Sequence, residues 1–174
     1  GLIDRYFLRD DEFPAGVDFL IMGTPVETIV PLTKAFLPRL EPGCIISDVG
    51  SVKGEIVRGM ERILTRQIPF VGGHPIAGSE QWAAQAARPN LFVSHRCVLT
   101  PTRKTDRKAL KKIAVLWREV GAEVEIMSPE IHDRLLGVIS HLPHVLVYAL
   151  VNTLERPPLP GVDFKKYCAG GFKD

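Results

Sequence analysis

Short apolar runs that lead into polar segments with glycine, and that alternate with stretches of helical periodicity, constrain the fold of this chain most strongly. Residues 17–22, 43–48 and 68–71 are nearly all apolar, as is typical of strands buried on both faces of a parallel sheet. Residues 26–40 and 52–66 repeat apolar side chains at helical spacing, which predicts helices between these strands. The alternation indicates an α/β fold with a doubly wound parallel sheet.

The character of the sequence changes near residue 127. Before this point the alternation continues with a predicted strand, helix and strand at residues 96–100, 106–120 and 122–127. After it, Pro129 lies at a typical helix start, and residues 131–154 are rich in apolar side chains without strand-like alternation. We therefore predict an α/β domain over residues 1–127 and the beginning of a helical domain over residues 128–174.

The first three predicted strands each lead into a polar loop that contains glycine. The loops are Gly23-Thr24-Pro25, Asp48-Val49-Gly50-Ser51 and Gly72-Gly73-His74. In open α/β sheets, ligands bind outside the carboxyl ends of the strands. The sequence therefore predicts that the three loops converge on one functional site.

The third loop, Gly72 to Glu80, reads Gly-Gly-His-Pro-Ile-Ala-Gly-Ser-Glu. Glycine allows a close backbone approach or a positive φ, and proline stiffens the chain that follows. An imidazole has an ordinary pKa of about 6.5 and so exchanges protons near neutral pH. A structural turn with a solvated histidine is the alternative, but the glycines and small polar residues around His74 favour an active-site loop.

Ser51 and Thr24 also have purely structural interpretations. Ser51 precedes a predicted helix, and serine is a preferred N-cap residue, so capping alone would explain it. Capping and catalysis are compatible at this position. Thr24-Pro25 is likewise a good helix start.

Four segments resemble the prephenate/arogenate dehydrogenase family, the nicotinamide-dependent enzymes of tyrosine biosynthesis. In order, they are Gly23-Thr24-Pro25-Val26, Asp48-Val49-Gly50-Ser51-Val52-Lys53, Gly72 to Glu80, and His132-Asp133 followed by Ser140-His141-Leu142-Pro143-His144. The resemblance covers nearly the whole chain. It implies a Rossmann-like sheet, truncated at its N-terminus, followed by the start of an all-α dimerisation domain. The implied reaction is the NAD- or NADP-dependent oxidative decarboxylation of prephenate to 4-hydroxyphenylpyruvate, or of arogenate.

The resemblance implies roles for residues of the three loops. His74 matches the catalytic histidine of the family, which accepts the proton of the substrate hydroxyl. Ser51 matches the serine that orients the same hydroxyl and contacts the nicotinamide. Thr24, Pro25, Gly50 and Ser51 match positions that bind the cofactor, and the choice between NAD and NADP stays open.

The resemblance also implies substrate-binding residues farther along the chain. His144, and less directly His132, match positions near the carboxylates of the substrate. Glu80 matches an acidic residue at the mouth of the site, which pairs with the lysine of a segment that here contains Gly170 and Lys173. Ordinary helix packing for His132 and a surface salt bridge for Glu80 are the alternatives.

A metal site is not predicted. His141 and His144 share a helix face and could be combined with Asp133 as ligands. However, Pro143 lies between the two histidines, no Glu or Cys completes a recognisable ligand pattern, and the family uses no metal.

Composition argues against several classes of protein. A net charge of +2 is too small to indicate nucleic-acid binding. Cys44, Cys97 and Cys168 are odd in number and widely spaced, which argues against a disulfide framework and a cysteine-bound metal. No apolar stretch reaches the ~20 residues of a membrane span, and no signal peptide is recognisable. We therefore expect a cytoplasmic protein without a membrane partner.

The glycine-rich turn G-x-G-x-x-G, which holds the pyrophosphate in dinucleotide-binding folds, does not occur in the sequence. In the family this turn precedes the matched segments, and a carboxylate-binding arginine follows them. We therefore interpret the chain as an internal fragment of a homodimeric dehydrogenase, itself inactive. The alternative is a non-catalytic binding or dimerisation module, if these 174 residues are the complete polypeptide.

Overall fold

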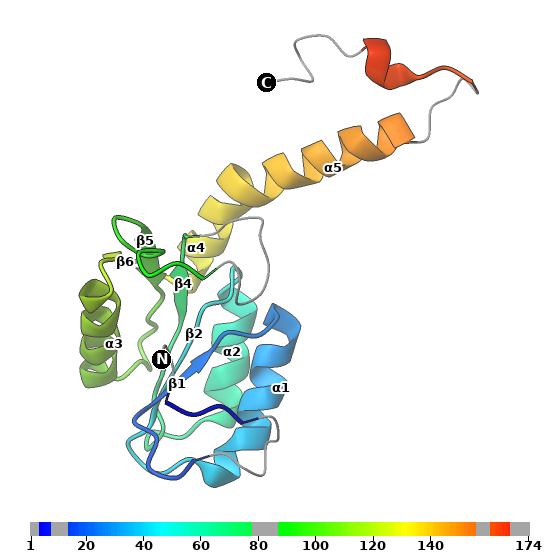
Figure 1. Cartoon of the computed structure of the whole chain (residues 1–174). Helices are drawn as coiled ribbons and strands as arrows, with labels where there is room; N and C mark the ends of the chain where they lie inside the picture. The colour runs from blue at the N-terminus through cyan, green and yellow to red at the C-terminus, as the bar shows by residue number, and fades with distance from the viewer. Residues whose placement is uncertain (1–3, 8–13, 78–86, 156–160, 168–174) are drawn as a thin grey trace. The chain divides into compact units, whose positions relative to one another are not determined.

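The computed structural model describes residues 4–7, 14–77, 87–155 and 161–167 (Figure 1). Its contacts divide the chain into two compact units, Gly1–Asp133 and Arg134–Asp174. The division falls inside helix α4 (Pro129–Leu136), which begins just beyond the predicted domain boundary. The boundary at residue 127 itself stays a prediction.

The first unit contains two three-stranded sheets. One consists of β1 (Phe19–Met22), β2 (Ile45–Asp48) and β3 (Phe70–Val71), and the other of β4 (Gly73–Pro75), β5 (Arg96–Leu99) and β6 (Glu123–Ile126). The first sheet is parallel throughout, and β5 is parallel to β6. Gly72 alone separates β3 from β4, so both sheets share one nearly continuous stretch of extended chain.

The predicted α/β fold is confirmed, but the sheet is not parallel throughout. β4 and β5 are antiparallel, with Gly73 opposite Leu99 and His74 opposite Val98. An apolar run shows that a strand is buried and carries no information about its direction, so the sequence pattern could not reveal this reversal.

Three helices cover the two faces of the sheets in the first unit. They are α1 (Val26–Phe36), α2 (Gly54–Ile63) and α3 (Arg107–Glu119), and a short 3-10 helix, Leu37–Arg39, follows α1. Neighbouring residues of β2 point to opposite faces, as strand geometry requires. Ile45 packs into a core that includes Ile113 and Trp117 of α3, whereas Ile46 packs with Ile29 of α1. Helices therefore lie on both faces, as a doubly wound fold requires.

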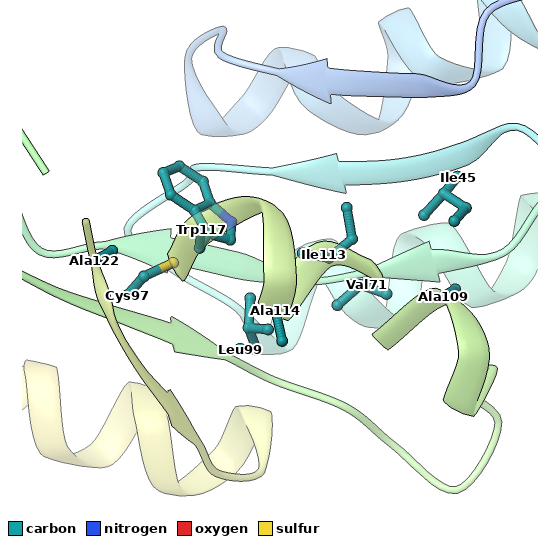
Figure 2. Close-up of a cluster of buried hydrophobic side chains, with 9 residues drawn as sticks. All are labelled: Ile45, Val71, Cys97, Leu99, Ala109, Ile113, Ala114, Trp117 and Ala122. Carbon is teal, nitrogen blue, oxygen red and sulfur yellow. The ribbon is translucent and has the colours of Figure 1, made fainter. Parts of the chain in front are cut away.

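Figure 2 shows the core on the α3 side, to which the helix contributes the small residues Ala109 and Ala114 beside Ile113 and Trp117. Trp117 lies over this core and packs edge-on against Phe92, with ring centroids 5.1 Å apart. Helix α3 begins after Asp106, whose carboxylate accepts a hydrogen bond of 2.7 Å from the backbone of Ala109. The core members are Ile45, Val71, Cys97, Leu99, Ala109, Ile113, Ala114, Trp117 and Ala122.

In the second unit, the end of α4 continues through a π-helical segment, Gly137–His141, into α5 (Leu142–Glu155), and a 3-10 turn, Phe164–Tyr167, follows. Four consecutive residues of α5, from Val145 to Tyr148, are each more than half exposed. Because successive helical residues point about 100° apart, these side chains cover all sides of the helix. In water, exposed apolar surface of this extent marks a site of association with another protein or with a membrane.

The expectation that no apolar segment is long enough to span a membrane is wrong. The helical run Pro129–Thr153 has 25 residues and is long and apolar enough to cross a membrane, by length and composition alone. Pro143 and several polar residues interrupt the apolar run without ending the helix, so the span does not stand out in the sequence.

Candidate active site

The candidate site lies where β1, β2 and β4 end. Thr24 follows β1, Gly50 and Ser51 follow β2, and His74 lies within β4. The expectation that His74 occupies a loop is therefore wrong. Its backbone pairs with β5, and Ile76 extends this pairing by donating a hydrogen bond of 2.7 Å to the carbonyl of Arg96. A strand holds the imidazole more rigidly than a loop would.

Gly73, the residue before the histidine, is required by close packing and has no positive φ. A Cβ atom at this position would lie 2.9 Å from the carbonyl oxygen of Asp48, which is closer than real Cβ contacts. The absence of a side chain thus lets the strand of His74 approach the end of β2. The glycine provides proximity between two strand ends, not a turn.

The His74 imidazole belongs to a chain of three side chains. Its Nδ1 atom lies 2.9 Å from Nε2 of His132, and the two rings meet edge to face with centroids 5.1 Å apart. Nδ1 of His132 lies 2.8 Å from Oδ1 of Asp133. His132 is completely buried. The chain therefore runs from a carboxylate through a buried imidazole to the imidazole of His74.

Asp133 also holds the start of helix α2. Its Oδ1 and Oδ2 atoms accept hydrogen bonds of 2.8 Å from the backbone N–H groups of Lys53 and Gly54. Partial burial raises the pKa of the Asp133 carboxyl, but the bonds from Lys53, His132 and Gly54 outweigh burial and lower its pKa below the usual value. Asp133 is therefore a carboxylate at neutral pH.

Helix α2 begins at Gly54 and receives no cap from a side chain of its own N-cap residue, Lys53. The interpretation of Ser51 as the N-cap is therefore wrong. Asp133, eighty residues from Lys53 in sequence, performs that function instead. Ser51 is exposed at the end of β2, which leaves its hydroxyl available for another role.

The ionised carboxylate of Asp133 fixes the tautomers of His132 and His74. A carboxylate only accepts hydrogen bonds, so Nδ1 of His132 carries the proton that faces Asp133. In the neutral imidazole Nε2 of His132 is then an acceptor, and Nδ1 of His74 must donate to it. A neutral His74 therefore has its lone pair on Nε2, which is the arrangement of a general base.

A fully buried ion pair, Lys53 with Asp48, adjoins these three side chains. The ammonium group of Lys53 donates hydrogen bonds to Oδ2 of Asp48 and, at 2.7 Å, to the carbonyl oxygen of Gly73. Oδ1 of Asp48 accepts from the N–H of Gly73 at 3.2 Å, and Oδ2 accepts from the N–H of Gly50 at 2.9 Å. Burial raises the pKa of Asp48 and lowers that of Lys53, while their attraction opposes both shifts.

The residues expected to bind the cofactor lie together at the ends of β1 and β2. The Thr24 hydroxyl is buried and has no hydrogen-bond partner among the residues that the structure describes. Buried hydroxyls are normally paired, so this one is suited to a polar ligand group. Pro25 immediately precedes α1, so the interpretation of this dipeptide as a helix start is also correct. These features fit a dinucleotide placed along the strand ends.

Four further predicted substrate residues lie in the second unit or outside the described residues, so their positions at this site stay predictions. His144 is exposed in the second unit, where its Nδ1 atom lies 2.8 Å from the carbonyl oxygen of Ser140. Glu80, Gly170 and Lys173 lie outside the described residues. Within the described ranges, no three metal-binding side chains form a cluster.

Sequence reasoning missed the roles of Asp48, Lys53 and Asp133. One signal was present, because Lys53 lies three and four positions before the buried residues Ile56 and Val57. A lysine on the apolar face of a helix indicates a buried partner. The pairing of His132 with His74 had no comparable signal, since it joins segments that are 58 residues apart.

Comparison with known proteins identifies the family. Residues 9–126 match the model of the prephenate dehydrogenase nucleotide-binding domain, and residues 128–174 match the prephenate dehydrogenase dimerization domain. The chain belongs to the prephenate dehydrogenase family. The resemblance inferred from the four sequence segments is thereby confirmed.

Relatives within the family are substantially longer. The chain is 38% identical to prephenate dehydrogenase of Bacillus subtilis over 100% of its own length and 47% of that protein. It is 34% identical to cyclohexadienyl dehydrogenase of Zymomonas mobilis, covering 90% of this chain and 54% of the relative. The chain thus spans about half the length of these curated relatives.

A solved structure shares the fold closely. It is prephenate dehydrogenase from Aquifex aeolicus in complex with hydroxyphenyl propionate and NAD+, with 45% identity and a TM-score of 0.85. The similarity covers 95% of this chain and 56% of that one. The Rossmann-like fold class and the membership of this enzyme family are therefore both confirmed.

Proposed function

We propose that this chain is the catalytic portion of an NAD- or NADP-dependent prephenate or arogenate dehydrogenase. The observation that carries the proposal is the series of side-chain contacts from Asp133 through His132 to His74. These residues lie in or next to the domain that matches the family's nucleotide-binding domain. The arrangement orients the imidazole of His74, and oxidation of a hydroxyl-bearing carbon requires an oriented base.

His74 acts as the general base in this proposal. Its Nε2 atom accepts the hydrogen bond of the substrate 4-hydroxyl and takes the proton as the ring carbon loses hydride. It returns the proton to the phenolic oxygen after the ring carboxylate has left as carbon dioxide. His132 and Asp133 keep Nδ1 of His74 protonated, so that Nε2 remains the basic atom.

This assignment gives His132 a role that differs from the one implied by the resemblance. Its Nδ1 and Nε2 atoms face Asp133 and His74, respectively. Both nitrogens are thus engaged within the protein. We propose that His132 orients the base and does not bind a substrate carboxylate.

The cofactor-binding residues, including Ser51, complete the proposed active site. A bound nicotinamide would accept the hydride, and we propose that Thr24, Pro25, Gly50 and Ser51 hold that cofactor. Two observations support this assignment: the buried Thr24 hydroxyl has no hydrogen-bond partner among the described residues, and Ser51 is exposed. Ser51 would also donate to or accept from the substrate hydroxyl.

The remaining site residues stay proposals carried by the resemblance. We propose that His144 binds a substrate carboxylate, and that Glu80 pairs with Lys173 near Gly170 at the mouth of the site. The Aquifex aeolicus protein was crystallised with hydroxyphenyl propionate, which combines a phenol with a carboxylate. That ligand supports a site with one group for a hydroxyl and another for a carboxylate.

We also propose that the protein is a cytoplasmic homodimer and that the exposed apolar residues of α5 contribute to the dimer. The match of residues 128–174 to a dimerization domain supports this use of the helix. It accounts for the apolar surface without a membrane.

The test is an assay of the full-length product of the reading frame that contains this chain. Prephenate and arogenate are each combined with NAD+ and with NADP+, and formation of the reduced cofactor is followed. We expect turnover with at least one pair. Absence of turnover with all four pairs, in a protein shown to be folded, would leave the non-catalytic module as the better interpretation.

A further inference from the structure

We propose that Lys53, through its ion pair with Asp48, is a positioning residue for the base His74. This inference rests on the proposed function, because it assigns Lys53 a task in the same reaction. Lys53 would touch neither substrate nor cofactor and would act through the backbone and through His132.

The contacts of Lys53 form a closed ring around the base. Its backbone N–H donates to Asp133, Asp133 binds His132, and His132 contacts His74. His74 is joined by a peptide bond to Gly73, whose carbonyl oxygen accepts the Lys53 ammonium at 2.7 Å. One residue therefore holds the imidazole partner of His74 with its main chain and the backbone of His74 with its side chain.

Asp48 extends this ring to the second proposed catalytic residue. Its carboxylate accepts from the N–H of Gly50, which is adjacent to Ser51, and from the N–H of Gly73, which is adjacent to His74. The ion pair thus connects the backbone beside Ser51 to the backbone beside His74. The spacing between the two catalytic side chains depends on this connection.

Stability alone does not account for a charged pair at this place. Both side chains are completely buried, and removing two charges from water is costly. Apolar side chains of similar volume are often as stable or more so. They could not donate to the carbonyl of Gly73, however, and they could not accept from Gly50 and Gly73. The specific advantage of the pair is therefore fixed geometry at two strand ends.

The experiment uses the full-length protein and two variants. The first is Lys53→Met, and the second combines Lys53→Met with Asp48→Asn, which leaves no uncompensated buried charge. We expect both to lower kcat by about 10- to 100-fold, because small displacements of a catalytic group have effects of this size. The KM for the dinucleotide should change by less than about threefold.

The second readout is the tautomer of His74, measured from its imidazole nitrogens by nitrogen-15 NMR. The wild type should show a single tautomer with the proton on Nδ1, whereas the variants should show a mixture. A purely structural role of Lys53 would lower the melting temperature and leave this tautomer unchanged. A mixed tautomer in the wild type would overturn the proposal without any variant.

Ile113→Ala is the matched control, because Ile113 is also fully buried but lies in the core on the α3 side. It should lower the melting temperature and leave kcat and the tautomer unchanged. The proposal fails if the double variant is folded with kcat within about threefold of wild type. If Lys53→Met does not fold, the double variant decides the question, and a double variant that does not fold either makes the ion pair a structural element and overturns the proposal.

Failure of this inference is distinguishable from failure of the proposed function. Active wild type with active Lys53 variants would refute only the positioning role. Wild type that oxidises neither prephenate nor arogenate would refute the function, and the tautomer comparison would still test what Lys53 does to His74.

Discussion

The two units of the chain differ in where their charged and apolar side chains lie. In the first unit, charged side chains such as Lys53 and Asp48 lie in the interior and bind one another and the backbone. In the second unit, the apolar residues of α5 lie on the outside. The first pattern stabilises one precise local geometry, whereas the second leaves surface for association. The difference fits the proposed function, in which the first unit carries the chemistry and the second contributes to the dimer.

The strongest test of this division is His74→Asn in the first unit. Loss of the general base should lower kcat by at least about 100-fold, with little change in dinucleotide affinity. Steady-state kinetics and cofactor titration of the full-length protein measure both quantities. His95→Asn is the control, since His95 is exposed and should tolerate the change. An unchanged kcat in His74→Asn would remove this residue from the chemistry.

Asp133→Asn should have the next largest effect. The amide no longer enforces the proton on Nδ1 of His132, so His74 loses its fixed tautomer. We expect kcat to fall about 10- to 100-fold, and the cap of α2 to weaken by about 1 kcal/mol. Kinetics and thermal unfolding check the two parts. A variant with lower stability but unchanged kcat would reduce Asp133 to a helix cap.

The second unit is tested by Leu146→Asp, because Leu146 is exposed on α5. A charge in the proposed dimer surface should raise the dimer dissociation constant by about tenfold or more, as measured by sedimentation. Asn152→Asp on the same helix adds the same charge at a polar, exposed position and is the control. If both variants dimerise like the wild type, α5 is not the interface.

The smallest effect concerns acid stability. The pKa of Asp133 lies below its usual value of 3.8 in the folded chain. Its contribution to stability is therefore complete above the unfolded pKa and is lost as pH falls through the lower folded pKa. The difference in melting temperature between wild type and Asp133→Asn should be constant from pH 6 to about pH 5 and shrink below about pH 4. A difference that grows on acidification would contradict the assignment.

Sequence patterns predicted the elements of the first unit well, because burial on both faces gives strands such as residues 45–48 an unmistakable apolar run. Thr24 and Ser51 follow β1 and β2 for a general reason, since neighbouring parallel strands end together, whereas His74 lies within β4 of the second sheet. The strand at residues 96–99 was predicted but its antiparallel pairing with β4 was not, because an apolar run carries no information about strand direction. Contacts between distant segments, above all His132 with His74, depend on tertiary packing that no local pattern encodes.

Gly73 makes no contact through a side chain, yet it limits how this family of sequences can vary. Any larger residue there would meet the carbonyl oxygen of Asp48 at 2.9 Å and would separate the strand that carries the base from its neighbour. A natural sequence that retains His74 but substitutes Gly73 would keep every residue of the chemistry and lose its alignment. A substitution at position 73 is therefore expected to displace His74 even where every proposed catalytic side chain is kept.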